Sequence, residues 1–375
     1  SWRGGSSPGT SPPASGSRRG RIVKRAALVA VLAAVAASLS SACSPLYVIR
    51  AGIAEAKILA ARRPIPEVVL DPATDDRTRG KLVLVMEARR FARDSLRLDV
   101  GDSYTSFTRL EQDTLALVLS AAHRDRLQSK TWWFPIVGHV PYKGFFDEDD
   151  ALEAKIDLEE EGFDTYLRPT AAFSTLGWFA DPLLSTLLRY DEVELVETVL
   201  HELSHNHLFV GGHVRFNESF ATFVGRVGAI RFFCTRQGGG WDTLKCARAQ
   251  ARWRDVRRFG VFIDDLVADL QAVYGDAALT YERKVARREG VFERYRERFR
   301  DEVQPSLESL TFGSFLTTPL NNATLLSRMR YYHRLDDFHL LYERHEESLA
   351  DAVAELARRV DGVEDPFDLL PEGGG

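Results

Sequence analysis

The stretch VETVLHELSHNHLFVGGHVRFNESFATF, residues 196–223, contains two histidines four positions apart, His201 and His205, with Glu202 directly after the first. On an α-helix, side chains four positions apart lie on the same face, one turn above the other. Two imidazoles on one face can bind a single zinc ion, and the adjacent carboxylate can act as a general base on a water molecule there. The spacing therefore predicts a metal site on a helix.

The residues around the motif predict the helix that such a site requires. Asp191, with Glu194 three positions later, is typical of an N-cap with a capping box. Apolar residues at helical spacing follow, and Gly211 and Gly212 end the pattern. The apolar residues are Val193, Leu195, Val196, Val199, Leu200, Leu203 and Leu208. We expect a buried helix near Glu192–Phe209.

A catalytic zinc site usually has three protein ligands and one water, so a third ligand must come from elsewhere. The pattern H-E-x-x-H-x-x-G-x-x-H would place a histidine where the chain has Gly211. The next segment, FNESFATFVGRVGAIRFF (216–233), has helical apolar spacing, an expected N-cap at Asn217 and a carboxylate at Glu218. A tight turn at the two glycines would fold this helix back on the first, so that Glu218 faces both histidines.

HELSH followed by NESFATF resembles the gluzincin metallopeptidases, whose second motif often reads N-E-x-F-A. More narrowly, the chain is similar to the bacterial predicted zinc-dependent aminopeptidase family. Further segments carry this likeness: YVIRAGIAEAKILAARRPI (47–65), VGHVPYKGFFD (137–147), STLGWFADPLLSTLLRYDE (174–192) and NNATLL (321–326). The resemblance implies a zincin-like fold, peptide substrates, one zinc ion per chain held by His201, His205 and Glu218, and Glu202 as the catalytic base.

The resemblance leaves the position of cleavage open. The G-x-M-E-N stretch with which well-studied gluzincin aminopeptidases hold a substrate α-amine is absent from this sequence. Aminopeptidase activity is therefore expected from the family likeness alone. A zinc endopeptidase and a catalytically inactive, zinc-binding envelope lipoprotein are the alternatives.

Peptide hydrolysis also needs a hydrogen-bond donor for the developing oxyanion. Tyr331 and Tyr332, in RMRYYHRLDDF, are the main candidates. The others are His333, His213 and Tyr142. Asn217 and Glu197 are candidates to orient a ligand imidazole by hydrogen bonding to it.

The N-terminal residues predict export. Residues 1–17 are rich in Gly, Ser and Pro, and RRGRIVKR followed by an apolar run (26–42) is typical of a secretory signal. Cys43 follows at once, which favours a lipoprotein acylated at Cys43. Ordinary signal cleavage, or retention of the uncharged run 26–49 as a membrane anchor, are the alternatives. We therefore expect the bacterial cell envelope, with a periplasmic lipoprotein favoured.

The charge balance argues against a nucleic-acid partner. The chain has a formal net charge of −5, but residues 1–42 carry six basic and no acidic residues. The remainder therefore has 43 Lys and Arg against 54 Asp and Glu. An acidic body does not attract a phosphate backbone. The sequence does not indicate an oligomeric state.

Two cysteines remain after Cys43. Cys234 and Cys246 flank TRQGGGWDTLK. In an oxidising compartment they could form a disulfide, and two free buried thiols are the alternative.

The rest of the chain predicts an α+β fold, mostly helical, with a small β-sheet beside the H-E-x-x-H helix. Residues 1–42 are expected to be a leader and 43–375 a single domain. Within it we expect N-terminal helices (43–130, including a helical stretch in 108–127), a β-rich layer with the active-site helices (131–235), and C-terminal helices (248–375).

Overall fold

The structure is a computed structural model that describes residues 57–110, 116–134, 138–145, 147–170 and 181–371. The leader, Cys43 and the apolar run 26–49 lie outside these ranges. Among the described helices, none combines the length and the apolar character that a membrane crossing requires.

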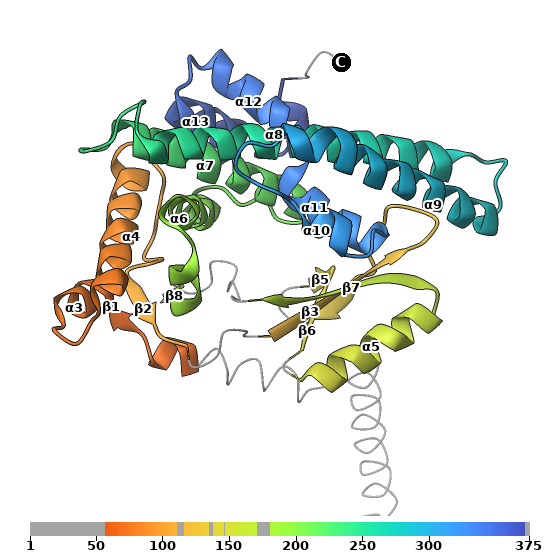
Figure 1. Cartoon of the computed structure of the whole chain (residues 1–375), viewed down its shortest axis with the longest axis horizontal. Helices are drawn as coiled ribbons and strands as arrows, with labels where there is room; N and C mark the ends of the chain where they lie inside the picture. The colour runs from red at the N-terminus through yellow and green to blue at the C-terminus, as the bar shows by residue number, and fades with distance from the viewer. Residues whose placement is uncertain (1–56, 111–115, 135–137, 146, 171–180, 372–375) are drawn as a thin grey trace, which may run out of the picture.

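The largest core is formed by long helices around the motif. These are α4 (Asp76–Asp94), α6 (Glu192–His207), α7 (Val214–Thr235) and α8 (Leu244–Gly275). In Figure 1, α4 lies at the left and α8 runs across the upper part, below α12 and α13, with α6 and α7 beneath it. Apolar residues of all four helices form one buried cluster. The motif helix is thus enclosed by the main core, as its apolar stripe predicts.

A three-stranded antiparallel sheet forms the second layer. Its central strand β3 (Ala116–His123) pairs with β6 (Lys143–Phe145) on one side and β7 (Phe163–Thr170) on the other. The helix α5 (Glu148–Glu160) packs on this sheet, with Ala151 and Leu158 against its apolar face. Figure 1 shows this layer below α10 and α11, at the lower right.

The helical stretch expected in 108–127 is wrong, because this segment contains β3. Residues 118–122 are all buried. The reason is that β3 contacts two helices, α5, which covers one face of the sheet, and α11. A strand buried in this way does not alternate between apolar and polar residues. A short apolar run therefore cannot be distinguished from a buried helix by its period.

The remaining described strands form two smaller sheets. One has the order β1 (Arg63–Pro64), β2 (Ser106–Thr108), β8 (Leu183–Leu184), and the other is the hairpin of β4 (Trp132–Phe134) and β5 (Gly138–Val140). The strands expected from the aromatic and β-branched residues of 131–146 are confirmed as β4, β5 and β6. The region 43–130 is not purely helical, because it also contains β1, β2 and β3.

The C-terminal region is helical, as expected. Its elements are α9 (Tyr281–Arg298), a π-helical turn (Phe299–Val303), α10 (Ser314–Thr317), α11 (Asn322–Tyr332), α12 (Leu335–Arg344) and α13 (Leu349–Arg359). Shorter helical pieces are α3 (Ile65–Leu70) and the 3-10 turns Ser185–Arg189, Gln304–Ser306 and Pro366–Leu369. Helices with small sheets confirm the α+β class in its general form.

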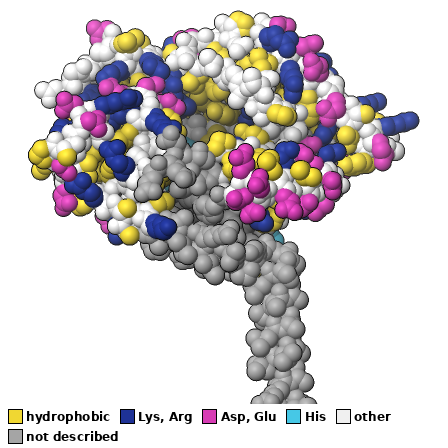
Figure 2. All heavy atoms as spheres, turned by 60° about the horizontal axis from the view of Figure 1, so that its bottom comes forward, with side chains coloured by type: hydrophobic (Ala, Val, Ile, Leu, Met, Phe, Trp, Pro, Cys, Tyr) yellow, Lys and Arg dark blue, Asp and Glu magenta, His cyan; other side chains and the backbone are white. Residues whose placement is uncertain are grey.

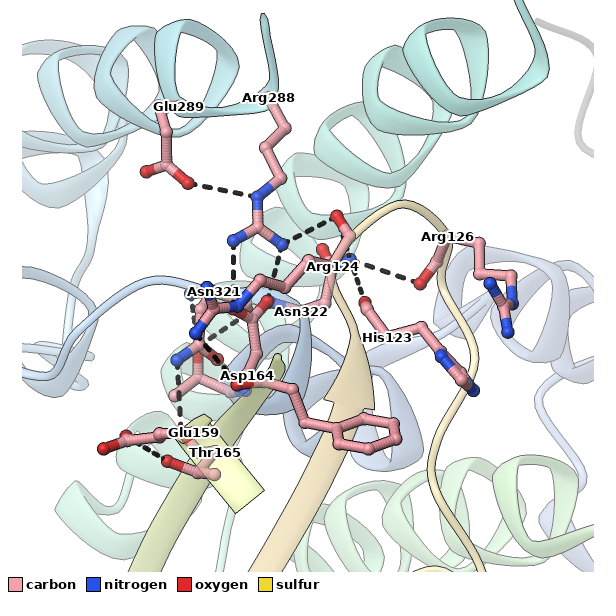
Figure 3. Close-up of polar contacts among 12 residues, drawn as sticks. His123, Arg124, Arg126, Glu159, Asp164, Thr165, Arg288, Glu289, Asn321 and Asn322 are labelled. Atoms are coloured by element: carbon pink, nitrogen blue, oxygen red, sulfur yellow. Dashed lines mark hydrogen bonds and ion pairs between the residues drawn. The ribbon is translucent and has the colours of Figure 1, made fainter. Parts of the chain in front are cut away.

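A buried polar cluster fastens α11 to the sheet (Figure 3). We call Asp164, Arg288 and Asn322 the Asp164 cluster. The carboxylate of Asp164 on β7 accepts hydrogen bonds from Nη1 (2.6 Å) and Nη2 (2.9 Å) of Arg288 on α9, and from the backbone N–H of Asn322 (2.9 Å). The Asn322 amide donates to the carbonyl of His123 at 2.8 Å. The first turn of α11 is thereby held on β3 and β7, which fixes where the rest of that helix lies.

The surface is hollowed between two parts of the molecule. Figure 2 shows the hollow, with apolar side chains at its back, between the N-terminal helices on the left and the sheet layer on the right. Acidic side chains gather over α5 on the right-hand rim.

Candidate active site

The two helices predicted from the opening stretch bring the three expected ligands together. His201 Nε2 lies 3.3 Å from Oε2 of Glu218, and His205 Nε2 lies 3.9 Å from Oε1 of the same carboxylate. The three ligand atoms lie within 4.8 Å of one another. Two imidazoles from α6 and one carboxylate from α7 therefore converge on a single point, which is the donor set that zinc accepts.

The start of α6 follows from its sequence. The side chain of Asp191 accepts hydrogen bonds from the backbone N–H of Val193 (2.9 Å) and Glu194 (3.1 Å), which confirms it as the N-cap. The helix ends at His207, two residues before the expected end, because Leu208 adopts an extended conformation (φ −141°, ψ 115°).

The turn between the helices differs from the expectation at one residue. The N-cap of α7 is His213, so the prediction of Asn217 as the cap is wrong. The turn is tighter than expected, and α7 begins three residues after Gly211, with Gly212 in the left-handed region at φ +83°. Asn217 instead bonds the turn itself: its amide accepts from the N–H of Val210 (2.9 Å) and donates to the carbonyl of Val210 (2.8 Å).

A glycine lets α6 and α7 approach closely beside the ligands. A Cβ atom on Gly225 would lie 2.6 Å from the backbone oxygen of Glu197 and 3.1 Å from Cβ of His201. Sequence reasoning missed this residue. The available signal was a glycine inside an otherwise apolar helix, which often marks a packing requirement.

The protonation properties of His205 and Glu218 suit metal binding. Burial opposes protonation of His201, but its hydrogen bond to Glu218 and the charges of Glu202 and Glu218 raise its pKa overall. Burial, with a smaller contribution from the neighbouring His201, lowers the pKa of His205 to about 4, so this imidazole is neutral at pH 7. Burial opposes ionisation of Glu218, but the hydrogen bond to His201 and the charges of His201, His205 and Arg330 together lower the Glu218 pKa. A neutral imidazole and an ionised carboxylate are the forms that coordinate a metal. Nδ1 of His205 is buried and finds no hydrogen-bond partner among the described residues.

Glu202 stands apart from the ligand set. Burial raises the pKa of its carboxyl group, and the carboxylates of Glu218 and Asp181 raise it further, against the effect of His201. A carboxylate with a raised pKa is a stronger base than an ordinary carboxylate.

A cavity of about 200 Å³ opens beside Glu202. His201 and Glu202 from α6, Arg226 from α7, and Tyr331 and Tyr332 from α11 contribute to its walls. The ring centroids of Tyr331 and His201 are 6.2 Å apart. Burial raises the pKa of the Tyr331 phenol, so it keeps its proton and can act as a hydrogen-bond donor. The structure thus brings both predicted tyrosines to the cavity.

Residues 46–364 match the model of a protein family described as "Putative aminopeptidase". The chain belongs to this family. A search of curated proteins and a search of solved structures gave no match. Membership supports a peptidase function, and the match includes α6, α7 and α11, which form the site.

In this family member the remaining candidate residues have other contacts. Glu197 is buried and accepts from Nη2 of Arg252 at 2.7 Å and from Arg226, so its carboxylate is already paired. His333 pairs through Nδ1 with Asp264 on α8 at 2.7 Å. His213 caps α7. Among the described residues, no hydrogen bond or ion pair joins these three side chains to the ligand imidazoles.

The two later cysteines lie side by side. Cys234 at the end of α7 and Cys246 at the start of α8 are joined in a disulfide, with S–S 2.00 Å and Cα atoms 4.9 Å apart. Both side chains are buried. The disulfide ties the second ligand helix to the helix that packs over it.

Proposed function

We propose that this member of the aminopeptidase family is a zinc-dependent peptidase that holds one zinc ion with His201, His205 and Glu218. The observation that carries the proposal is the convergence of these three ligand atoms beside a fourth, separate carboxylate, Glu202. The donor set fits zinc in chemistry, because it consists of imidazole nitrogen and carboxylate oxygen. It also leaves room for a further ligand, as catalytic zinc sites require.

When bound, zinc polarises the scissile carbonyl and lowers the pKa of water to near 7. The chain supplies the proton transfers. Glu202 lies beside the ligands without being one, so it can accept a proton from the attacking water and pass it to the leaving amine. Tyr331 can donate a hydrogen bond to the oxyanion that develops on the substrate. Tyr332 lines the same cavity and is a second candidate for that role.

Metal analysis tests the proposal directly. The purified protein should contain about one zinc ion per chain, as the three-ligand site requires. His205→Ala should lose the zinc, because two ligands remain, whereas Glu202→Gln should keep it, because Glu202 is not a ligand. Equal zinc content in the wild type and His205→Ala would contradict the site. Zinc without hydrolysis of any peptide would instead favour an inactive zinc-binding protein.

We propose removal of N-terminal residues rather than internal cleavage, on the strength of the family description. Acetylating the substrate amine tests this. In an aminopeptidase with a buried anionic subsite for the amine, acetylation should reduce kcat/KM by about 10²-fold or more, the loss expected when a buried charge goes unpaired. Acetylated and free peptides cleaved at equal rates would indicate an endopeptidase.

We also propose export to the bacterial cell envelope and acylation at Cys43. The basic and apolar residues before Cys43 support this. The protein should appear in the membrane fraction and incorporate labelled fatty acid, and Cys43→Ser should abolish the labelling.

Exported protein should also have no free thiol at Cys234 and Cys246, because an oxidising compartment keeps the disulfide closed. Thiol labelling of both cysteines under non-reducing, denaturing conditions would contradict export.

A further inference from the structure

Three arginines in the described part of the chain are buried, and one of them lacks a carboxylate partner. Arg252 is 4% exposed and binds Glu197, and Arg288 is 4% exposed and binds Asp164. Arg330 is 8% exposed, and no carboxylate of the described residues lies within ion-pair distance of it, although the charge of Glu218 acts on it from farther away. A buried charge without a partner is costly, so proteins normally pair it. Arg330 departs from the rule that the other two follow.

Arg330 lies beside the candidate metal centre. Its backbone carbonyl accepts a hydrogen bond from the hydroxyl of Ser219, the residue after Glu218, at 3.3 Å. The next residue, Tyr331, has its ring near the ring of His201. The Arg330 guanidinium carbon lies 5.5 Å from the ring centroid of Tyr142, so the group is stacked on an aromatic face, an arrangement that favours a cation.

A second guanidinium group, that of Arg168, belongs to the same region as Arg330. Arg168 on β7 is partly buried, and none of the described carboxylates pairs with it. The strand β7, which carries Arg168, packs against α11, which carries Arg330. The charges of Arg168 and Arg330 both lower the pKa of Tyr142 and of Tyr331, against the larger effect of burial. Two like charges close together in a partly buried region repel each other. An anion between them would relieve the repulsion.

We propose that Arg330 and Arg168 form a binding site for a carboxylate group of the substrate, next to the metal centre. Guanidinium groups bind carboxylates through paired hydrogen bonds. With zinc bound, the two negative charges of Glu218 and Glu202 would only equal the charge of the ion, so the charges of the two arginines would remain uncompensated. The inference rests on the proposed function and narrows it. A site this near the ligands selects short peptides with a terminal carboxylate, or peptides with an acidic side chain next to the cleaved bond.

Direct binding measurements can test this without turnover. The full chain carrying Glu202→Gln is loaded with zinc and titrated by calorimetry with Ala-Ala-Ala, with its C-terminal amide, and with Ala-Glu-Ala amide. The free acid should bind about 10- to 100-fold more tightly than the Ala-Ala-Ala amide, the effect of one charged hydrogen-bond partner. Arg330→Met should reduce the affinity for the acid to that for the amide. Arg300→Met, an exposed arginine after α9, is the matched control and should change neither.

The peptide series identifies the source of the carboxylate. If Ala-Glu-Ala amide binds as tightly as the Ala-Ala-Ala free acid, the site binds an acidic side chain. If it does not, the site binds the C-terminal carboxylate. Arg168→Met should shrink the acid-to-amide ratio as well, which keeps the proposal testable if Arg330→Met fails to fold. Acid and amide affinities within about twofold, or an unchanged ratio in both variants, would overturn the inference. Zinc measured on the same samples reports separately on the proposed function.

Discussion

The Asp164 cluster and the candidate metal centre are both buried polar groups built around a carboxylate, but they use their hydrogen-bonding capacity differently. Asp164 accepts from both ends of the Arg288 guanidinium and from a backbone N–H, and the Asn322 oxygen accepts from the hydroxyl of Tyr274 at 2.8 Å. At the candidate metal centre, Nε2 of His201 and of His205 faces the Glu218 carboxylate, and Arg330 has no carboxylate of the described residues within ion-pair distance.

The difference separates a cluster whose hydrogen bonds hold the fold from a site that we propose binds a ligand. A buried polar group that is fully bonded contributes rigidity, whereas one left unpaired lowers stability unless a ligand completes it. The Asp164 cluster fixes α11 on the sheet, and the candidate metal centre lies where α6, α7 and the far end of α11 meet. Substitutions should therefore affect stability at the first site and activity at the second.

The largest effect is expected from Glu202→Gln. This change should reduce kcat/KM by about 10²- to 10⁴-fold, because the variant lacks the proposed general base. The free energy of unfolding should stay equal or rise, because an amide costs less to bury than a carboxylate. Peptide hydrolysis and urea unfolding of the same preparation give both values. An active Glu202→Gln variant would remove this residue from the chemistry.

Asp164→Ala should have the opposite profile. It leaves Arg288 buried without its partner and should lower the free energy of unfolding by about 3–5 kcal/mol. Urea unfolding measures this. Asp269→Ala, which breaks the exposed pair with Arg294, is the matched control and should cost less than about 1 kcal/mol. A loss at Asp164 no larger than at Asp269 would show that the cluster is not what holds the sheet to α9 and α11.

A smaller effect is expected at Gly225, where α6 and α7 meet. Gly225→Ala should lower the free energy of unfolding by about 1–3 kcal/mol, because the new methyl group forces the helices apart. It should also weaken zinc binding, since His201 lies at the contact. On α9, a Cβ atom at Gly290 would meet nothing within 4 Å, so Gly290→Ala should stabilise by about 0.5–1 kcal/mol. If both alanines stabilise the protein, close helix contact is not required.

Local patterns predicted the ligand helices well. The spacing of His201 and His205, the cap at Asp191 and the two glycines are features of neighbouring residues, and α6 and α7 follow from them. The strand β3 was missed because burial on both sides hides its period. Arg330 and Gly225 were missed because their meaning depends on partners: an arginine in sequence is ordinary, and only the fold shows that this one is buried without a carboxylate.

All three ligand residues lie within 18 positions of one another, on two helices joined by a turn that Asn217 holds through Val210. Arg330 and Tyr331 arrive from more than 100 residues away, through the contact between Ser219 and Arg330, whose sequence separation is 111. Contacts between near neighbours form faster than contacts that close long loops. A chain refolding in the presence of zinc should therefore bind the metal before it recovers peptide hydrolysis. The delay between zinc binding and hydrolysis would measure how long α11 takes to pack against α7.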